Sequence, residues 1–368
     1  MNDQEYMKIA LDLAGRGVGQ TAPNPMVGAV IVKDGAIIGQ GWHEKYGGPH
    51  AERNALASCR ESPQGATMYV TLEPCCHYGK QPPCADAVIE AGIRRVVVGS
   101  GDPNPLVAGK GIKMLRERGL EVVEHVLQEE CERLNEVFFH YIRTKRPFVV
   151  MKYAMTLDGK IAAYTGASKW ITGEEARGHV QRMRHRYTAI MVGVGTVLVD
   201  DPLLSCRIPG GKNPLRIICD TNLRTPPNSQ IVTTASQIPT ILATCCLERE
   251  KWQVFEDAGC RVISVDRRNG HVDLSQLMEK LGQEQIDSVL LEGGGTLNWA
   301  ALESGIVQKV QAYIAPKLFG GQTAKTPVEG AGVPVPAEGV HLINTSMTLL
   351  GEDFLIEGEV EQLVYRNC

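Results

Sequence analysis

The sequence predicts an α/β protein of two domains. Apolar runs typical of strands alternate with segments whose apolar residues recur at helical spacing, and this alternation is typical of sheets with parallel strand pairs covered by helices. A chain of 368 residues is also long for one hydrophobic core. The basic stretch 143–146, followed by Pro147, marks the predicted boundary. It gives domains at residues 1–146 and 147–368.

In the first domain, apolar residues at helical spacing predict a helix through Tyr6, Ile9, Ala10 and Leu13. Residues 26–32 and 36–42 read as two strands of a hairpin, because the turn residues Lys33-Asp34-Gly35 separate them. The remaining elements are helices at 51–59, 85–92, 111–119 and 128–141 and strands at 68–73 and 94–100.

The second domain begins with the buried-strand pattern of residues 148–160, which leads into a turn. Apolar runs predict further strands at 189–198, 215–220, 240–245, 288–292 and 310–316. Helical patterns occupy 174–186, 273–282 and 296–305. The second domain is therefore a second α/β unit, and the tail after about Gly330 carries no motif that indicates a role.

Composition and charge exclude several classes of protein. No stretch approaches the roughly 20 apolar residues of a membrane span, and the acidic N-terminal segment is unlike a signal peptide. The net charge of −4, without a long basic run, favours a small-molecule substrate over a nucleic acid. Eleven cysteines without an export signal indicate thiols in a reducing compartment. We expect a cytoplasmic protein that binds neither membrane nor nucleic acid.

A cluster of potential metal ligands is the most informative feature. His50, Cys75 and Cys84 supply one imidazole and two thiolates, three of the four positions of tetrahedral zinc, and a water can take the fourth. Zinc lowers the pKa of such a water, and Glu52, two residues after the histidine, is placed to move protons. His-x-Glu followed by Pro-Cys is typical of zinc nucleobase deaminases. We therefore predict that His50, Cys75 and Cys84 bind Zn²⁺ and that Glu52 is the catalytic residue.

Helix geometry limits where these residues can lie. Residues two apart in a helix face nearly opposite ways, so His50 and Glu52 share a site only if His50 enters at or before the first turn. Gly48-Pro49 suits such a start, and Cys84 follows two prolines and precedes a helix. A structural zinc with Cys76 or His77 as fourth ligand is the alternative, although such a site has no use for Glu52.

A second candidate site lies in the second domain. The apolar strand ending at Leu291 runs into Gly293-Gly294-Gly295 and then a helix, an arrangement that lets backbone N–H groups and the helix N-terminus approach a phosphate. The spacing differs from Gly-x-Gly-x-x-Gly and lies far from the domain start, which disfavours a doubly wound dinucleotide fold.

Eight residues, in place of two, separate Cys75 from Cys84. This PCCHYGKQPPC segment, with TAPNPMVGAVIV, GPHAE, YVTLEPC and GDPNPLVAGKG, closely resembles the deaminase domain of the bifunctional riboflavin-biosynthesis deaminase/reductase family. KYAMTLDGKIA, SKWIT, GVGTVLVDDPLLSCR and LLEGGGTLN resemble the reductase domain of the same family. The resemblance covers nearly the whole chain. It implies a cytidine-deaminase-like α/β/α domain followed by a dihydrofolate-reductase-like α/β domain.

The resemblance implies two sequential reactions. The 2-amino group of 2,5-diamino-6-(5-phosphoribosylamino)pyrimidin-4-one is removed at zinc, and NADPH then reduces the ribosyl side chain to ribityl, giving 5-amino-6-(5-phosphoribitylamino)uracil. Two active domains in one chain often assemble further, so we expect a homo-oligomer.

The resemblance also implies roles for individual residues. Substrate contacts correspond to Asn24, His43 and Lys80 in the deaminase domain and to Ser168, Arg184, Leu204, Arg207 and Glu292 in the reductase domain. Guanidinium forks suit a phosphate, which makes Arg184 and Arg207 its expected partners. Contacts with NADPH correspond to Ala154, Trp170, Thr196, Asp200, Thr221, Gly294, Gly295, Thr296, Leu297, Asn298, Trp299 and Ala300.

Three other readings compete with this one. In the first, the chain is a zinc deaminase for cytidine or a transfer-RNA adenosine, and its second domain binds RNA. In the second, it is a non-enzymatic scaffold held together by zinc that binds a nucleotide. In the third, it is an enzyme in which only one of the two activities survives. The long cysteine spacing and the acidic charge disfavour the first reading, and Glu52 disfavours the second.

Overall fold

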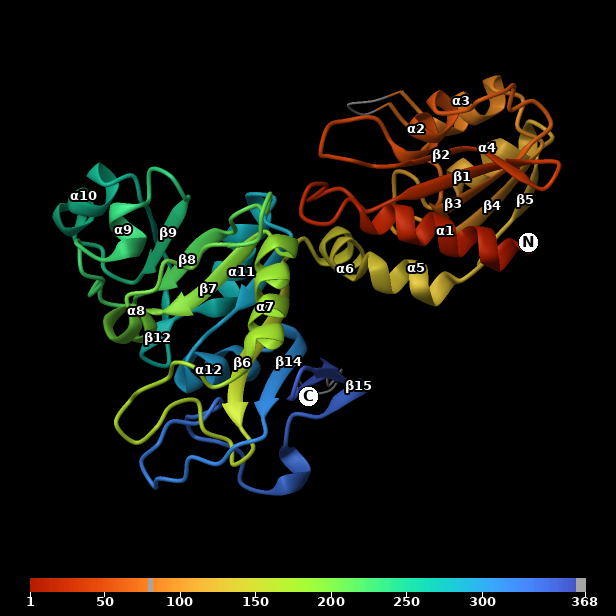
Figure 1. Ribbon diagram of the computed structural model, residues 1–368. Coiled ribbons are helices and arrows are strands. Elements are labelled where there is room, and N and C mark those ends of the chain that lie inside the picture. The colour runs from red at the N-terminus through yellow and green to blue at the C-terminus, as the bar shows by residue number, and fades with distance from the viewer. Residues whose placement is uncertain (79–81, 362–368) are drawn as a thin grey trace. The chain divides into compact units, whose positions relative to one another are not determined.

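The computed structural model describes residues 1–78 and 82–361. The chain divides into two compact units, residues 1–145 and 146–368 (Figure 1). Both units combine helices with a sheet, which confirms the α/β class predicted from the sequence. None of the helices in the described ranges is long and apolar enough to span a bilayer.

The N-terminal unit alternates helices and strands. Its elements are α1 (Asp3–Gly15), β1 (Gly28–Lys33), β2 (Ala36–Trp42), α2 (Ala51–Ala57), β3 (Thr67–Leu72), α3 (Cys84–Glu90), β4 (Arg95–Ser100), α4 (Lys110–Glu117), β5 (Glu121–Val123), α5 (Gln128–Leu134) and α6 (Glu136–Thr144). The β1–β2 hairpin confirms the predicted one, and its turn residues Asp34 and Gly35 both adopt positive φ, as a tight hairpin turn requires.

The strands of this unit form one sheet in the order β2-β1-β3-β4-β5, with β3, β4 and β5 parallel. Side chains from α2, α3, α4 and α6 pack in one core cluster against the sheet, and those from α1 and α5 pack in another. Because β3 is buried on both sides, the segment that follows it at residues 73–75 starts from a rigid support.

The single helix predicted over residues 128–141 is wrong. The structure has two helices, α5 and α6, which meet at Asn135. The Asn135 side chain accepts a hydrogen bond from the backbone N–H of Met26 (2.8 Å) and donates one to the Met26 carbonyl (2.9 Å). This tertiary contact breaks a pattern that is helical in sequence alone.

The C-terminal unit is built around a larger sheet. Its strands are β6 (Phe148–Thr156), β7 (Ala189–Gly193), β8 (Leu215–Cys219), β9 (Thr240–Thr244), β10 (Arg261–Ser264), β11 (Arg267–Arg268), β12 (His271–Val272), β13 (Ser288–Leu291), β14 (Val307–Ala315), β15 (Leu342–Leu350) and β16 (Asp353–Val360). Its helices are α7 (Glu174–Arg186), α8 (Val194–Asp200), α9 (Gln230–Thr233), α10 (Arg249–Asp257), α11 (Leu274–Gln283), α12 (Gly295–Glu303) and the short 3₁₀ turn η1 (Pro336–Glu338).

Nine of these strands form one sheet, ordered β10-β9-β8-β7-β13-β6-β14-β16-β15. The seven strands from β10 to β14 are parallel, and β16 and β15 extend the sheet antiparallel. α11 and α12 pack on one face of the sheet, and α8, α9 and α10 pack on the other. The carboxyl ends of β7, β8 and β13 therefore meet at one edge, where open α/β sheets bind their ligands. The tail after Gly330 supplies the two antiparallel strands.

Candidate functional sites

The three predicted zinc ligands lie together in the N-terminal unit. Nδ1 of His50 is 3.6 Å from Sγ of Cys75 and 3.4 Å from Sγ of Cys84, and all three ligand atoms lie within 4.8 Å of one another. Tetrahedral zinc with bonds of about 2.0–2.3 Å places neighbouring nitrogen and sulfur ligands about 3.5 Å apart. The donor set and its spacing therefore fit Zn²⁺.

Local structure explains how residues so far apart in sequence converge. His50 is the N-cap of α2 and has extended backbone angles, so Glu52 shares its site, as the helix argument requires. Cys75 lies three residues after the end of β3, and Cys84 is the first residue of α3. The hydrogen bond from the Cys84 thiol, together with His50, lowers the pKa of Cys75 to about 4, which favours the thiolate that a metal needs.

Glu52 is the buried carboxyl group of this site. It is 3% exposed, and burial, reinforced by the nearby charge of Cys75, raises its pKa to about 7. A group with a pKa near neutrality accepts and releases protons readily at that pH. Glu52 thus has the properties of a general acid and base.

Arg53 connects the α2 helix to the long segment between the two cysteines. Its Nη2 donates to the carbonyl oxygens of Pro83 (3.0 Å) and Pro82 (3.3 Å), immediately before Cys84. No local pattern indicates this contact, because an arginine beside Glu52 is typical of a solvated helix position. The contact ties the end of the segment to the helix that follows His50.

We expect Arg53→Gln to weaken zinc binding roughly tenfold or more, because residues that orient metal ligands typically contribute 10–100-fold to metal affinity. Competition with a chromophoric chelator measures this affinity. Arg60→Gln, which removes an exposed arginine just after α2, is the matched control. A zinc affinity equal to that of the unsubstituted protein would show that the Pro82 and Pro83 contacts do not orient Cys84.

Glu73 organises the loop on the other side of the site. Its carboxylate accepts hydrogen bonds from the backbone N–H groups of Gly109 (2.9 Å), Gly111 (2.9 Å), Ile112 (3.2 Å) and Asp102 (3.3 Å). A Cβ at Gly111 would lie 2.0 Å from the Pro74 carbonyl oxygen, so only glycine fits there. Glu73 therefore anchors the 101–111 loop against the segment that carries Cys75.

A cavity of about 260 Å³ opens beside His50, Glu52 and Cys75. Its lining includes Asn24 and His43 from the predicted substrate set, and it adds His77, Asp102 and Asn104, which sequence reasoning did not assign. Lys80 lies outside the described residues.

His43 and Asp102 are the titratable neighbours of the zinc cluster in this cavity. His43 Nδ1 donates to the Pro49 carbonyl (3.0 Å), which leaves Nε2 to accept from Asn24 (3.2 Å), and burial lowers the pKa of His43. Burial raises the pKa of Asp102 to about 6. The cavity thus offers a neutral imidazole and a desolvated carboxyl group to a polar heterocycle.

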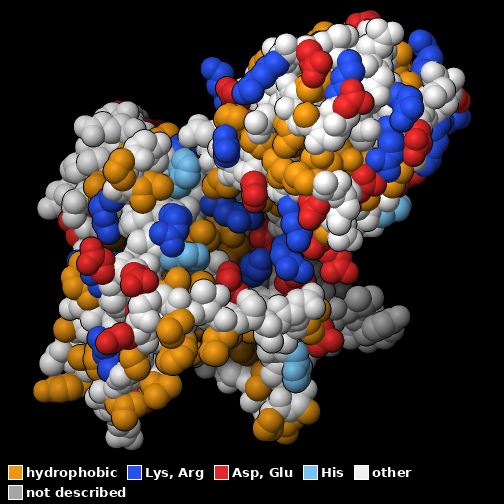
Figure 2. Space-filling model, turned by 45° about the vertical axis from the view of Figure 1, so that its right-hand side comes forward, with side chains coloured by type: hydrophobic (Ala, Val, Ile, Leu, Met, Phe, Trp, Pro, Cys, Tyr) orange, Lys and Arg blue, Asp and Glu red, His pale blue; other side chains and the backbone are white. Residues whose placement is uncertain are grey.

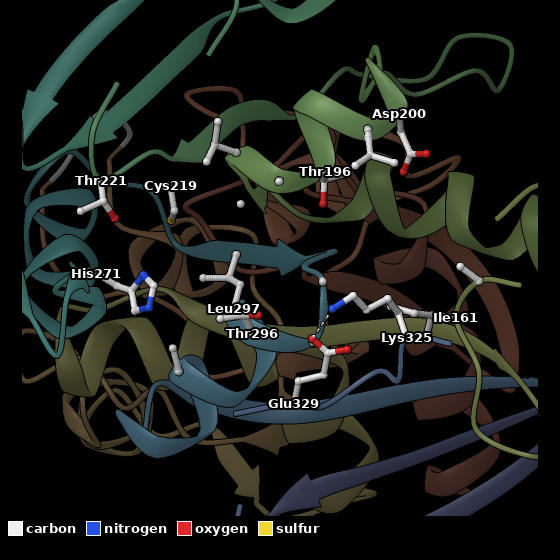
Figure 3. Close-up of a pocket in the computed structure, with 18 of the residues that line it drawn as sticks. Ile161, Thr196, Asp200, Cys219, Thr221, His271, Thr296, Leu297, Lys325 and Glu329 are labelled. Atoms are coloured by element: carbon white, nitrogen blue, oxygen red, sulfur yellow. Dashed lines mark ion pairs between the residues drawn. The ribbon is translucent and has the colours of Figure 1, made fainter. Parts of the chain in front are cut away.

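The C-terminal unit has a larger cavity, of about 580 Å³, at the carboxyl ends of β7, β8 and β13 (Figure 3). A Cβ at Gly294, the N-cap of α12, would meet nothing within 4 Å, so a phosphate can approach the backbone at the start of that helix. The cavity volume and the helix N-terminus fit a dinucleotide. Predicted cofactor residues that line it are Thr196, Asp200, Thr221, Gly294, Gly295, Thr296, Leu297 and Ala300, and the predicted substrate residue Ser168 joins them.

Four of the predicted cofactor residues lie outside this lining. Trp170 is 61% exposed, with the Arg177 guanidinium 4.9 Å from its ring centroid, and Ala154 packs against the cluster around Tyr313. The Asn298 side chain is buried and donates to the Pro327 carbonyl (2.8 Å). Trp299 packs against Gly330. Asn298 and Trp299 therefore support the loop beside the cavity.

Next to the cavity, Glu292 lies in a buried network of charges. Arg184 donates Nε to one carboxylate oxygen (2.8 Å) and Nη2 to the other (3.0 Å), and Lys152 Nζ lies 3.6 Å from Oε2. The three side chains are only 12–14% exposed. Although burial raises the pKa of Glu292, the charges of Arg184 and Lys152 hold it at about 2.

This network changes the expected role of Arg184. Its Nη1 donates to the Ser205 carbonyl (3.1 Å), so three of its five N–H groups are used inside the protein. Sequence reasoning missed Lys152, although it is the one charged residue in the apolar run 148–155. Arg207 is exposed, whereas Leu204 is buried in the core with a φ of 54°.

Comparison with known proteins identifies both units. Residues 147–356 match the RibD C-terminal domain, and residues 1–100 match the cytidine and deoxycytidylate deaminase zinc-binding region. The riboflavin biosynthesis protein RibD of Actinobacillus pleuropneumoniae is 57% identical over 357 residues, which cover 97% of this chain and 95% of that protein.

Solved structures agree. Acinetobacter baumannii RibD, form 1, is 37% identical, covers 98% of this chain and 99% of its own, and has a TM-score of 0.87. The diaminohydroxyphosphoribosylaminopyrimidine deaminase/5-amino-6-(5-phosphoribosylamino)uracil reductase of Thermotoga maritima is 39% identical, with coverages of 97% and 98% and a TM-score of 0.85. The chain belongs to the RibD family of riboflavin biosynthesis, with a zinc-dependent deaminase domain followed by an NADPH-dependent reductase domain.

Proposed function

We propose that the N-terminal unit deaminates 2,5-diamino-6-(5-phosphoribosylamino)pyrimidin-4-one. In this proposal the C-terminal unit then reduces the ribosyl side chain, giving 5-amino-6-(5-phosphoribitylamino)uracil. The observation that carries the proposal is the buried Glu52 beside the His50, Cys75 and Cys84 cluster, in one chain with a dinucleotide-sized cavity. A structural zinc site would need no buried carboxyl group at this position.

In the deaminase site, His50, Cys75 and Cys84 would hold Zn²⁺, which activates a water for attack on the pyrimidine carbon that bears the amine. Glu52 takes a proton from that water and gives it to the ring nitrogen; it then takes the proton of the added hydroxyl group, which becomes the carbonyl, and gives it to the amino group, which leaves as ammonia. Water and the amine are consumed, and a carbonyl group and ammonia are formed. The pKa of about 7 suits Glu52 to both directions of proton transfer.

Substrate positioning falls to the polar groups that line the same cavity. Asn24 and His43 contact the pyrimidine in this proposal. Lys80, which lies outside the described residues, is proposed from its sequence motif alone to meet the phosphate as a point charge. The hydrogen bonds that join His43 to Pro49 and Asn24 hold its ring in one orientation, and burial lowers the pKa of His43 and so favours its neutral form.

In the reductase site, NADPH supplies a hydride to C1 of the opened ribosyl chain when bound. The reduction also adds a proton to the nitrogen bonded to C1, and in this proposal the buried cation Lys152, paired with Glu292, is the candidate proton donor. Glu292 holds Lys152 in place through their ion pair, and Arg184 fixes Glu292. The substrate contacts proposed from the resemblance remain Ser168, Arg184, Leu204, Arg207 and Glu292. Leu204 is buried, so it would act from beneath the site, and the exposed Arg207 is proposed to meet the phosphate.

Mass spectrometry of the product tests the whole proposal. The purified protein is incubated with the diaminopyrimidine substrate, with and without NADPH. We expect a deaminated product without NADPH and the ribityl product only when NADPH is present. Unchanged substrate in the presence of bound zinc would refute the riboflavin assignment. Deamination without reduction would show that only one activity survives.

We also propose that the chain forms a homo-oligomer through the β15 edge of the large sheet. β15 is the last strand in the sheet order, and Met347 and Leu349 on it are 69% and 62% exposed. Figure 2 shows further hydrophobic side chains on the visible surface of this unit. Exposed sheet edges and apolar patches favour association. Light scattering after size-exclusion chromatography should give a dimer or larger, and Met347→Lys should shift it toward monomer.

A cytoplasmic location is the corresponding proposal for the compartment. The cysteines of the described residues are all free thiols, including the zinc ligands Cys75 and Cys84. Reducing conditions keep such thiols available to a metal. Cell fractionation with an antibody against the chain should place it with cytoplasmic markers.

A further inference from the structure

The charges that line the reductase cavity are not evenly distributed. Five lining residues carry charged or titratable nitrogen and carboxyl groups: Asp200, Arg224, His271, Lys325 and Glu329. Figure 3 shows Asp200, Lys325 and Glu329 toward one end of the cavity and Thr221 and His271 toward the other. Arg224 lies three residues after Thr221 in the loop that follows β8. The carboxylates of Asp200 and Glu329 therefore lie at one end of the cavity, and the guanidinium of Arg224 and the imidazole of His271 lie at the other.

The nitrogen groups differ in whether the protein already uses them. Lys325 Nζ lies 3.6 Å from Glu329 Oε2, so its charge is partly neutralised (Figure 3). Within residues 1–78 and 82–361, the side chains of Arg224 and His271 have no hydrogen-bond or ion-pair partner, although the His271 backbone pairs with Arg268. A guanidinium that lines a cavity without a carboxylate partner is available for an anionic ligand.

The loop that carries Arg224 is held in place. Asp220 Oδ2 accepts hydrogen bonds from the backbone N–H and the hydroxyl of Thr225, each at 2.7 Å. Arg267 on β11 donates to Asn222 Oδ1 (2.8 Å). Arg267 also pairs in register with Val272, next to His271, so the β11–β12 hairpin joins the loop after β8 to the strand that carries His271. Arg224 and His271 therefore lie on two segments, the loop after β8 and the β11–β12 hairpin, that are joined by a hydrogen bond.

We propose that Arg224 and His271 bind the phosphate on the 2′ position of the adenosine ribose, the group that distinguishes NADPH from NADH. A dianionic phosphate is repelled by the end that holds Asp200 and Glu329 and is attracted to the end that holds Arg224. With the pyrophosphate at the N-terminus of α12, midway along the cavity, the nicotinamide then lies toward Ser168 and Asp200. This inference rests on the assignment of the cavity to NADPH.

Binding of adenosine nucleotides without the nicotinamide tests the phosphate site directly. Calorimetric titrations at fixed ionic strength with 2′,5′-ADP and 5′-AMP differ only in the 2′-phosphate. We expect the unsubstituted protein to prefer 2′,5′-ADP. Arg224→Gln should weaken 2′,5′-ADP binding roughly 10- to 100-fold, as loss of charged hydrogen bonds does, and leave 5′-AMP within twofold. His271→Gln should reduce the preference less.

Two further variants keep the test specific. Lys280→Gln removes one positive charge from α11, outside the cavity lining, and should change neither affinity. Arg224→Lys keeps the charge without the fork and should fall between Arg224→Gln and the unsubstituted protein.

The inference is overturned if Arg224→Gln binds 2′,5′-ADP as tightly as the unsubstituted protein, or if it loses 5′-AMP to the same extent. Equal affinity of the unsubstituted protein for both nucleotides would also overturn it. A parallel titration with NADPH separates these results from failure of the function itself, since an unsubstituted protein that binds no NADPH contradicts the reductase assignment.

Discussion

Glu52→Gln is expected to lower the deaminase kcat by roughly 10²–10⁴-fold, the contribution that a positioned general acid and base makes. Glutamine keeps the size of the side chain but cannot exchange a proton. Burial raises the pKa of Glu52 to about 7 and keeps solvent away from it, so water does not take over its role in proton transfer. Release of ammonia from the diaminopyrimidine substrate measures the rate.

The Glu52→Gln variant should keep its zinc, because Glu52 is not among the clustered metal ligands. It should also keep full reductase activity on the deaminated intermediate, which depends on the other unit. Glu44→Gln, an exposed glutamate in the same unit, should leave both activities unchanged. A zinc-loaded Glu52→Gln protein with more than a tenth of the original rate would exclude Glu52 as the proton-transfer group.

Arg184→Met is expected to destabilise the C-terminal unit by about 3–5 kcal/mol, the usual cost of removing one partner of a buried ion pair. The substitution leaves the buried Glu292 carboxylate with Lys152 at 3.6 Å as its remaining charged partner. Urea unfolding followed by tryptophan fluorescence reports mainly on this unit, because three of the four tryptophans, Trp170, Trp252 and Trp299, lie in it.

The loss should depend on pH. The folded pKa of Glu292 is held at about 2, below its ordinary value of 4.5, so the charge network stabilises the fold fully above about pH 4.5. This contribution disappears as the pH falls from about 4.5 toward 2. The difference between Arg184→Met and the unsubstituted protein should therefore be largest near neutral pH and shrink over that range.

Arg182→Met, an exposed arginine on the same helix, is the matched control and should change the free energy of unfolding by no more than about 0.5 kcal/mol. The reductase rate of Arg184→Met should also fall, because Glu292 would no longer be fixed against Lys152. A variant with unchanged stability at pH 7 would mean that Lys152 alone compensates the Glu292 charge.

Features encoded in short segments were predictable from the sequence. The β1–β2 hairpin follows from its turn residues, and the entry of His50 at the start of α2 follows from Gly48-Pro49 and the two-residue spacing to Glu52. The glycine run after β13 predicted that a phosphate can approach the N-terminus of the next helix, and Gly294 lines the cavity at that point. In each case, backbone conformation and residue chemistry within a few positions are enough.

Only the tertiary structure decided which distant side chains meet. Glu292 and Arg184 lie 108 positions apart and become partners because β13 is sandwiched between β6 and β7 in the sheet, with α7 leading into β7. Asn135 ends a helix because Met26, 109 residues away, offers both backbone groups to its side chain. Trp170 matches a cofactor motif in sequence, yet it lies outside the cavity lining. Periodicity records local burial, whereas long-range pairing depends on strand order, which no local pattern contains.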